Sequence, residues 1–329
     1  MIREQFWLGR PVFVTGATGF VGSWLIKRLL GLGAQVAALV HHPNPQSEFY
    51  RSGDYLHTWI IQGNLEDFAT LEYAINKFGI KTVFHLGAQS QVGAAQRSPL
   101  PTFEANIRGT YNLLEACRYH RTRVNQIVVA SSDKAYGTQP QLPYTETMPL
   151  QGTEPYEVSK SCTDLIAQSY FSAYGLPVAI ARCGNIYGGG DLNWDRIIPH
   201  AIRAYLTNRP PEIRSDGSFL RDYIYVEDVV DSYLVLAERL DTPDVGGQAF
   251  NFGPGRAVSV LEVVRRIQVL MGCQHLEPLI QNTATGEIHD QYLDSAKALH
   301  VLNWHHRYNL DEGLRETITW YRHFLASGT

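Results

Sequence analysis

The sequence contains few cysteines and few charged residues, and it has no long hydrophobic run. Its four cysteines are scattered over 329 residues, without a C-x-x-C pair or a nearby histidine at metal-ligand spacing. We therefore expect buried free thiols and no metal site. No apolar run approaches the roughly 18 residues of a membrane span, and the segment 1–10 carries acid and lacks the apolar core of a signal peptide. These absences predict a cytoplasmic protein that does not enter a membrane.

The chain also lacks a large excess of either positive or negative charge. Lys and Arg number 28 against 32 Asp and Glu, which gives a net charge of −4. Nucleic-acid binding needs a basic face, so nucleic acid is not expected as a partner. Apolar residues make up 44% of the chain and charged residues 18%, with no low-complexity tract and no repeat. This composition argues against disorder and is typical of a globular enzyme.

A glycine-rich turn near the start of the chain is the strongest local pattern. The apolar run 12–15 turns through Gly16, Gly19 and Gly22 into an amphipathic segment that ends near Leu32. This pattern predicts a strand, a tight turn and a helix. Glycine allows backbone amides to approach a pyrophosphate, and the helix N-terminus adds a favourable dipole. We interpret the turn as a dinucleotide site, although a G-x-x-G-x-x-G loop can also serve only to pack a helix on a strand.

Further apolar runs alternate with helical patterns up to residue 182. Strands are expected at 35–40, 59–62, 82–86, 124–130 and 177–182, and helices at about 102–118 and from Pro155 to Gly175. The alternation predicts an α/β fold with a parallel, doubly wound sheet of the Rossmann type. The regular alternation of strands and helices stops after residue 182. This indicates a dinucleotide-binding domain over 1–182 and a smaller mixed α/β domain over 183–329. Part of 222–252 has enough apolar periodicity to return to the sheet.

Candidate cofactor contacts lie in the glycine turn and at predicted strand ends. The second strand of a dinucleotide fold ends near the adenosine ribose. His41 stands there, in place of the acid that favours NAD or the arginine that favours NADP, so this position leaves the cofactor open. The contacts expected from these segments are Gly16, Thr18, Gly19, Phe20, Val21, His41, Asn64, Leu65, Leu86, Ala88 and Gln89.

Tyr156 and Lys160 lie four residues apart on a predicted helix, so their side chains project from one face. A free phenol has a pKa of about 10, and an adjacent ammonium favours the phenolate. Tyr156 would then take a proton from an alcohol while a hydride leaves for the cofactor. The alternative is a surface tyrosine packed over a lysine stem.

Three of these elements, in this order, resemble the extended short-chain dehydrogenase/reductase family. They are the T-G-x-x-G-x-x-G run from Thr15, Ser132 at a strand end, and Tyr156 with Lys160. The resemblance covers nearly the whole chain. It implies a Rossmann domain that binds NAD, with NADP less favoured, through contacts that include Tyr156 and Lys160. It also implies a nucleotide-sugar substrate held by the C-terminal domain, and a homodimer formed by the helices that contain Thr102 and Tyr156.

Two later segments, 182–188 and 221–226, resemble the substrate-binding segments of that family. In such proteins the asparagine and the second arginine approach the diphosphate, which implies this role for Asn185 and Arg221. The forked donors of arginine match phosphate oxygens. A salt bridge from Arg221 to a neighbouring aspartate is the alternative. The other expected substrate contacts are Arg196 and Asn251.

Asp133 and Lys134 follow Ser132 and bear on the reaction. Simple 4-epimerases of this family usually have small or nonpolar residues after the catalytic serine or threonine, whereas an acid and a base suggest elimination. The 4,6-dehydratases oxidise C4, remove the C5 proton with a base and help the C6 hydroxyl leave with an acid. By this resemblance Asp133 is the acid and Lys134 the base, roles that require opposite protonation. A surface ion pair is the alternative.

Several stretches resemble the CDP-glucose 4,6-dehydratases in particular. They are residues 6–7, 22–25, 132–134, 188–191 and 194–199. Ala17 and Val21 depart from the histidine and lysine common in that subfamily, which leaves the nucleotide open. We expect an NAD-dependent nucleotide-sugar 4,6-dehydratase; the alternatives are a nucleotide-sugar 4-epimerase and an inactive cofactor-binding regulator. The expected catalytic residues are Ser132, Asp133, Lys134, Tyr156 and Lys160.

Overall fold

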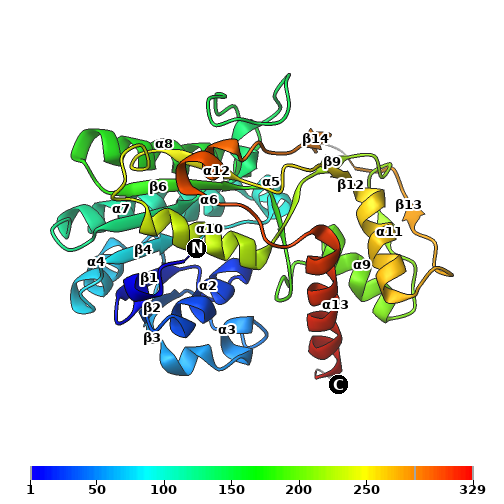
Figure 1. Cartoon of the computed structure of the whole chain (residues 1–329), viewed down its shortest axis with the longest axis horizontal. Coiled ribbons are helices and arrows are strands. Elements are labelled where there is room, and N and C mark those ends of the chain that lie inside the picture. Colours follow the sequence, from blue (N-terminus) through cyan, green and yellow to red (C-terminus); the bar gives the residue numbers. More distant parts are fainter. Residues whose placement is uncertain (1, 285–286, 328–329) are drawn as a thin grey trace.

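A parallel sheet of seven strands forms the centre of the computed structural model, which describes residues 2–284 and 287–327 (Figure 1). Its order is β11-β6-β5-β4-β1-β2-β3, and every neighbouring pair runs parallel. The predicted Rossmann-type doubly wound sheet is confirmed. The strands are β1 (Pro11–Thr15), β2 (Gln35–Val40), β3 (Trp59–Gln62), β4 (Thr82–His85), β5 (Gln126–Ala130), β6 (Val178–Cys183) and β11 (Ala249–Phe252).

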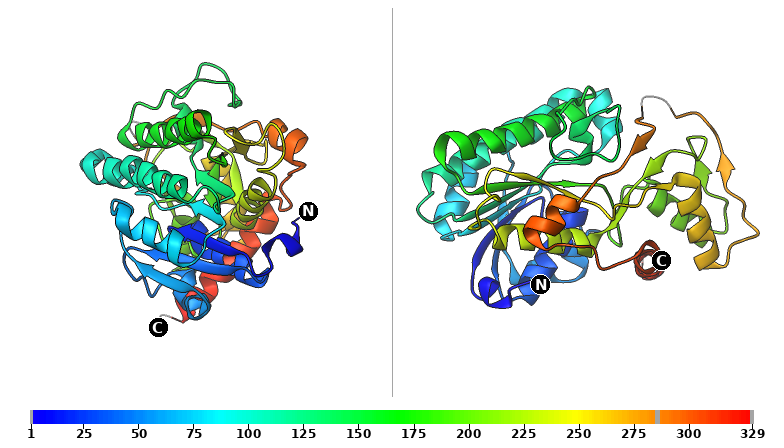
Figure 2. Two further views of the ribbon diagram at one scale, coloured as in Figure 1. Left: turned by 90° about the vertical axis from the view of Figure 1, so that its left-hand side faces the viewer. Right: turned by 45° about the horizontal axis from the view of Figure 1, so that its top comes forward.

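Helices cover both faces of this sheet because side chains alternate along each strand. On β1, Val12 and Val14 pack into one buried cluster, and Phe13 packs into the other. The first face is covered by α2 (Phe20–Gly31), α10 (Val226–Glu238) and α12 (Ala296–Leu302). The second is covered by α4 (Phe68–Lys77), α7 (Gly109–Tyr119) and α8 (Pro155–Tyr174), and Figure 2 shows the two helical layers on either side of the sheet.

The helix α8 begins and ends as its sequence predicts. Pro155 is its first residue, where a missing amide hydrogen costs nothing. Glu154 and Glu157 form a capping box at the N-terminus, and Gly175 ends the helix in the left-handed conformation, with φ of 63°. These signals fix the position of the helix turn that carries Tyr156 and Lys160.

The helix expected over about 102–118 is longer than predicted and interrupted. It is formed by α6 (Pro99–Phe103), a π-helical turn η2 (Glu104–Arg108) and α7 in direct succession. A π-helical turn inserts an extra residue into the helix and often occurs at functional sites. The remaining short helices of this half are α1 (Glu4–Trp7), α3 (Glu48–Arg51), η1 (Asp54–His57), α5 (Val92–Arg97) and η3 (Asp133–Tyr136).

A smaller lobe lies beside the carboxyl edge of the sheet (Figure 1). It contains α9 (Ile197–Leu206), α11 (Val260–Met271) and α13 (Leu310–Ala326), which share a buried cluster. Its short strands are β7 (Asn185–Tyr187) with β10 (Tyr223–Tyr225), β12 (Val258–Ser259) with β9 (Leu220–Arg221) and β14 (Asp290–Gln291), and β8 (Glu212–Ile213) with β13 (Leu279–Ile280). Between these lobe segments, α10 and β11 return to the large sheet.

No helix in the described part of the chain is long and apolar enough to cross a bilayer. Across residues 2–284 and 287–327 there is also no group of three His, Cys, Asp or Glu side chains that would hold a metal ion. The four cysteines are free. Cys117 and Cys183 are buried as expected, whereas Cys162, on α8, and Cys273, just after α11, are only half-buried.

Candidate active site

The glycines of the turn let backbone segments pack closely and leave helix amides free. Gly16 has a φ of 74°, and a side chain there would lie 2.8 Å from the backbone nitrogen of Gly87. A side chain on Gly22 would overlap the carbonyl oxygen of Gly16. Gly19 precedes α2 and supplies no capping side chain, so the first amides of this helix are left for an anion. The turn therefore fits the pyrophosphate of a dinucleotide, and Thr18, Phe20 and Val21 belong to the same turn.

The loop after β4 is held by polar groups that sequence reasoning missed. Thr15 Oγ1 accepts hydrogen bonds from the amides of Leu86, at 3.1 Å, and Gly87, at 2.9 Å. His85 Nδ1 lies 2.9 Å from the same oxygen, and burial lowers the pKa of His85 to about 3, so its ring is neutral. The only signal in the sequence is polar residues that end two apolar strands. Their bonds fix the course of residues 86–89.

The next residues of this loop are anchored to the π-helical turn. Gln89 donates its amide hydrogen to Asn106 Oδ1 at 2.7 Å, and Asn106 Nδ2 donates to Ser159 Oγ at 2.8 Å. Ala88 and Gln89 are half-buried. The predicted nicotinamide side of the site is thus tied to α8, one residue from Lys160.

The predicted adenosine side lies at the ends of β2 and β3. His41 and Asn64 are exposed, and the His41 ring is hydrogen-bonded to the Asn64 side chain. Leu65 is buried and lies against Gly87, which brings this turn to the glycine loop. The cofactor contacts proposed from the sequence therefore share one edge of the sheet, where open α/β folds bind their ligands.

Ser132 follows β5, and Tyr156 and Lys160 lie on α8. Lys160 Nζ donates to the carbonyl oxygen of Ala130 at 2.8 Å, and burial lowers the pKa of Lys160 to about 8. Burial raises the pKa of Tyr156 to about 12, although Arg196 and a hydrogen bond with Ser132 act in the opposite direction. We expected Lys160 to favour the phenolate of Tyr156. Arg196 is the cation that lowers the pKa of Tyr156 here, whereas Lys160 Nζ donates to Ala130; the role of Lys160 toward Tyr156 stays a prediction.

Asp133 and Lys134 form the short helix η3 directly after Ser132. Asp133 is buried, and Ser132 Oγ donates to its Oδ1 at 3.0 Å. Burial raises the pKa of Asp133 and lowers the pKa of Lys134, and in each case the other residue opposes the shift. Burial thus favours a protonated carboxyl beside a neutral amine. Lys134 Nζ donates to Gln291 Oε1 at 2.9 Å, a contact that sequence reasoning missed.

The two residues predicted to contact a diphosphate, Asn185 and Arg221, both lie in the smaller lobe. Asn185 Nδ2 is buried and has no hydrogen-bond partner among the residues the structure describes, as expected of a donor that awaits a ligand. Arg221 donates to the carbonyl oxygens of Ile288 and His289, each at 2.6 Å, rather than to Asp222 or Asp228. Arg196 pairs with Asp191 at 3.1 Å and lies near Tyr156. No counter-ion to Arg221 closer than Glu287, at 3.9 Å, is found in the described ranges.

Asp222 is a further buried carboxylate that sequence reasoning left unused. A side chain on Gly184 or on Gly253 would meet its oxygens, so both glycines are needed to admit it. Its Oδ2 accepts the amide hydrogen of Leu293 at 3.1 Å, and its Oδ1 has no partner within residues 2–284 and 287–327. Burial, with Asp133 nearby, holds the pKa of Asp222 well above its usual range.

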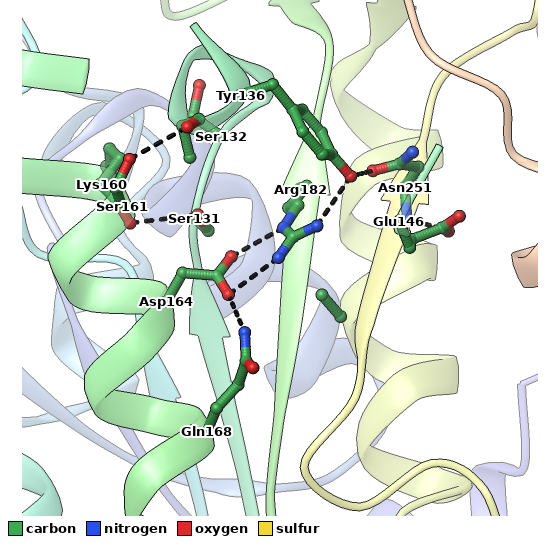
Figure 3. Close-up of polar contacts among 12 residues, drawn as sticks. Ser131, Ser132, Tyr136, Glu146, Lys160, Ser161, Asp164, Gln168, Arg182 and Asn251 are labelled. Carbon is green, nitrogen blue, oxygen red and sulfur yellow. Dashed lines mark hydrogen bonds and ion pairs between the residues drawn. The ribbon is translucent and has the colours of Figure 1, made fainter. Parts of the chain in front are cut away.

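A buried network lies behind the catalytic segment, and Asn251 belongs to it (Figure 3). Arg182 donates two hydrogen bonds to Asp164, at 2.7 and 2.9 Å, and a third to Tyr136 at 2.8 Å. The Tyr136 hydroxyl donates to Asn251 Oδ1 at 2.7 Å. Asn251 Nδ2 donates to the carbonyl oxygen of Tyr144 at 2.9 Å. The Asn251 side chain is therefore bonded within the protein, and its contact with substrate stays a prediction.

Comparison with known families agrees with this geometry. The model of the NAD dependent epimerase/dehydratase family matches residues 12–253. The chain belongs to this family. It is 33% identical to the CDP-glucose 4,6-dehydratase of Salmonella typhimurium, with 99% of this chain and 94% of that protein covered. It is 31% identical to the UDP-glucose 4-epimerase of Mycolicibacterium smegmatis, with 94% and 97% covered.

A solved relative in the same family is the dTDP-glucose 4,6-dehydratase of Bacillus anthracis in complex with NAD. It superposes with a TM-score of 0.84 at 25% identity, over 95% of this chain and 97% of that one. The family resemblance and the assignment of NAD made from the sequence are confirmed. Dehydratases and 4-epimerases occur at similar identity in this epimerase/dehydratase family, so the choice between the two reactions depends on the chemistry of the site.

Proposed function

We propose that the chain is a nucleotide-sugar 4,6-dehydratase, which converts a nucleoside-diphosphate hexose to its 4-keto-6-deoxy form. The observation that carries the proposal is the pair Asp133 and Lys134, placed directly behind Ser132. Burial shifts their two pKa values in opposite directions, toward a neutral acid and a neutral base. A 4-epimerase needs no such pair, because it only removes and returns hydrogen at C4.

The residues that would hold NAD are the glycine turn, the loop 86–89, Tyr156 and Lys160. NAD, when bound, supplies reversible hydride transfer. Lys160 Nζ donates to the carbonyl oxygen of Ala130 at 2.8 Å. This hydrogen bond holds the amine in one place although the lysine side chain is flexible. Asn106 fixes Gln89 by a hydrogen bond of 2.7 Å. Both hydrogen bonds form within the protein, so these groups lose little further conformational entropy when the ligand binds.

The protein groups then move protons in three places. Tyr156, bonded to Ser132, takes the proton of the C4 hydroxyl. Lys134 takes the proton of C5, which the new C4 ketone has acidified, and later returns it to C5. Asp133 gives its proton to the C6 hydroxyl, which leaves as water, and regains one through solvent from the proton released at O4. The sum is loss of one water.

We propose the smaller lobe as the substrate-binding domain, covering 183–329, with 1–182 and part of 222–252 as the NAD-binding domain. Asn185 would bind the diphosphate through its unpartnered amide, and Arg221 would do so by exchanging backbone carbonyls for phosphate oxygens. Arg196 belongs to this lobe and interacts electrostatically with Tyr156, so it would face the sugar. The 33% identity to a CDP-glucose 4,6-dehydratase favours CDP as the nucleotide.

The experiment that tests the function is incubation with CDP-, UDP-, GDP- and dTDP-glucose in the presence of NAD, followed by mass spectrometry of the sugar. Loss of one water identifies a dehydratase and names the nucleotide. An isomer of unchanged mass identifies a 4-epimerase, the second candidate, which the 31% identity to a UDP-glucose 4-epimerase favours. NAD binding without turnover on any sugar would mean that the chain is a cofactor-binding regulator.

We also propose a homodimer formed through α7 and α8. Both helices expose large apolar side chains, such as Tyr111 and Leu165, the latter 55% exposed. Exposed apolar residues on adjacent helices are typical of a helical interface between subunits. Light scattering of the wild type and of Leu165→Glu tests the proposal, because a charge in the interface should yield monomers.

A further inference from the structure

We propose that Gln291 is a positioning residue, which holds the amine of Lys134 toward the substrate during elimination. This inference rests on the dehydratase reaction proposed above. Gln291 lies in the smaller lobe, 157 residues beyond Lys134 in sequence, and no pattern around it suggests a role in catalysis.

The contact is a partly buried hydrogen bond between the two lobes of the fold. Lys134 Nζ donates to Gln291 Oε1 at 2.9 Å, and Gln291 is fully buried. Gln291 ends β14, which pairs in parallel with β9, and its register partner is Arg221. Leu293, two residues further along, donates its amide hydrogen to Asp222 Oδ2 at 3.1 Å. The backbone that carries Gln291 is therefore held by the pairing with β9 and by the Leu293 bond, whereas the side-chain Nε2 of Gln291 has no partner among the described residues.

A neutral acceptor suits a lysine that must act as a base. An amine without its extra proton has two N–H groups and one lone pair, so fixing one N–H limits the directions in which the lone pair points. Glutamine does this without adding charge. A carboxylate at the same position would favour the ammonium form, which has no lone pair to accept a proton.

Several charged groups near Lys134 act on its pKa in opposite directions. Asp133 on η3, Glu157 on α8 and Glu287 before β14 raise the pKa of Lys134, and Arg221 on β9 lowers it; burial is the largest influence and lowers it further. A fourth acid in contact with the amine would oppose burial directly. The uncharged amide of Gln291 thus preserves the base that the elimination needs.

The first test replaces the amide by a carboxylate of the same shape, Gln291→Glu. Competitive labelling with acetic anhydride across pH, read by peptide mass spectrometry, gives the titration midpoint of Lys134. We expect this midpoint to rise by about one pH unit or more. The matched control is Gln248→Glu, because Gln248 accepts from Lys297 at 3.0 Å away from the site; it should move Lys297 and leave Lys134 unchanged. An unmoved Lys134 in Gln291→Glu overturns the inference.

The second test removes the acceptor with Gln291→Leu and follows single turnovers. C4 oxidation, read from NADH absorbance, should keep its wild-type rate, and release of water should slow by about tenfold or more. Equal slowing of both steps would mean a merely structural role, and an unchanged elimination would mean no role; either result overturns the inference. If the wild type itself releases no water from any sugar, the dehydratase proposal fails, and the labelling experiment still reports whether Gln291 sets the state of Lys134.

Discussion

Replacement of Asp133 by asparagine should separate the two halves of the proposed reaction. The side chain is 4% exposed, so only a substitution of the same shape leaves the surroundings intact. Asparagine retains an oxygen to accept the hydrogen bond from Ser132 Oγ, which is 3.0 Å long in the wild type. It cannot give up a proton to the C6 hydroxyl. We therefore expect Asp133→Asn to oxidise C4 and fail to eliminate water.

The size of the effect follows from the step that is lost. General acid catalysis contributes about 100- to 10,000-fold, which corresponds to about 3 to 5 kcal/mol in the barrier to elimination. Oxidation should not slow, because asparagine is uncharged, like the protonated carboxyl that it replaces, and it keeps the acceptor of the hydrogen bond from Ser132. The variant should accordingly accumulate the oxidised sugar.

Stopped-flow absorbance of NADH and mass spectrometry of the quenched sugar measure the two steps in one experiment. Tyr156→Phe serves as the control, since it should stop oxidation and hence everything after it. The reasoning would be refuted if Asp133→Asn released water at the wild-type rate. It would also be refuted if oxidation and elimination fell by the same factor, because Asp133 would then support the fold of η3 rather than donate a proton.

Three further outcomes test the architecture. Gly22→Ala should weaken NAD binding about tenfold or more in a calorimetric titration, since its methyl group would overlap the Gly16 carbonyl, whereas Gly31→Ala, with nothing within 4 Å, should not. Asp164→Asn should lower the free energy of unfolding by about 3 to 5 kcal/mol in denaturant titrations, because it leaves the buried Arg182 without its counter-charge. Burial raises the pKa of Asp222 in the folded state, so ionisation of this residue should cost stability as pH rises above about 4, the ordinary pKa of the carboxyl. Relative to Asp222→Asn, the free energy of unfolding of the wild type should fall as pH rises above that value, and an unchanged difference would contradict this account.

Local signals were enough to predict the frame of the site. The glycine turn and the caps of α8 depend on neighbouring residues, so their position could be read from Gly16 and Pro155. The lobe could not be predicted in detail, because β9 and β14 are two-residue strands without periodicity. The meeting of Lys134 with Gln291 depends on that long-range pairing. The π-helical turn that presents Asn106 likewise has no sequence signal comparable to a proline or glycine.

Burial also explains why the sequence argument about Tyr156 was incomplete. In a poorly solvated site every ionisable group is driven toward its neutral form. A pKa shift toward the neutral form suits Asp133 and Lys134, whose proposed roles need a neutral acid and a neutral base. The same shift opposes the proposed role of Tyr156, which needs a phenolate. Burial by the fold thus favours the proposed elimination pair, whereas the proposed oxidation needs positive charge close to Tyr156. Arg196 belongs to the smaller lobe and pairs with Asp191, so the lobe that we propose to bind the sugar also supplies the charge that favours the phenolate.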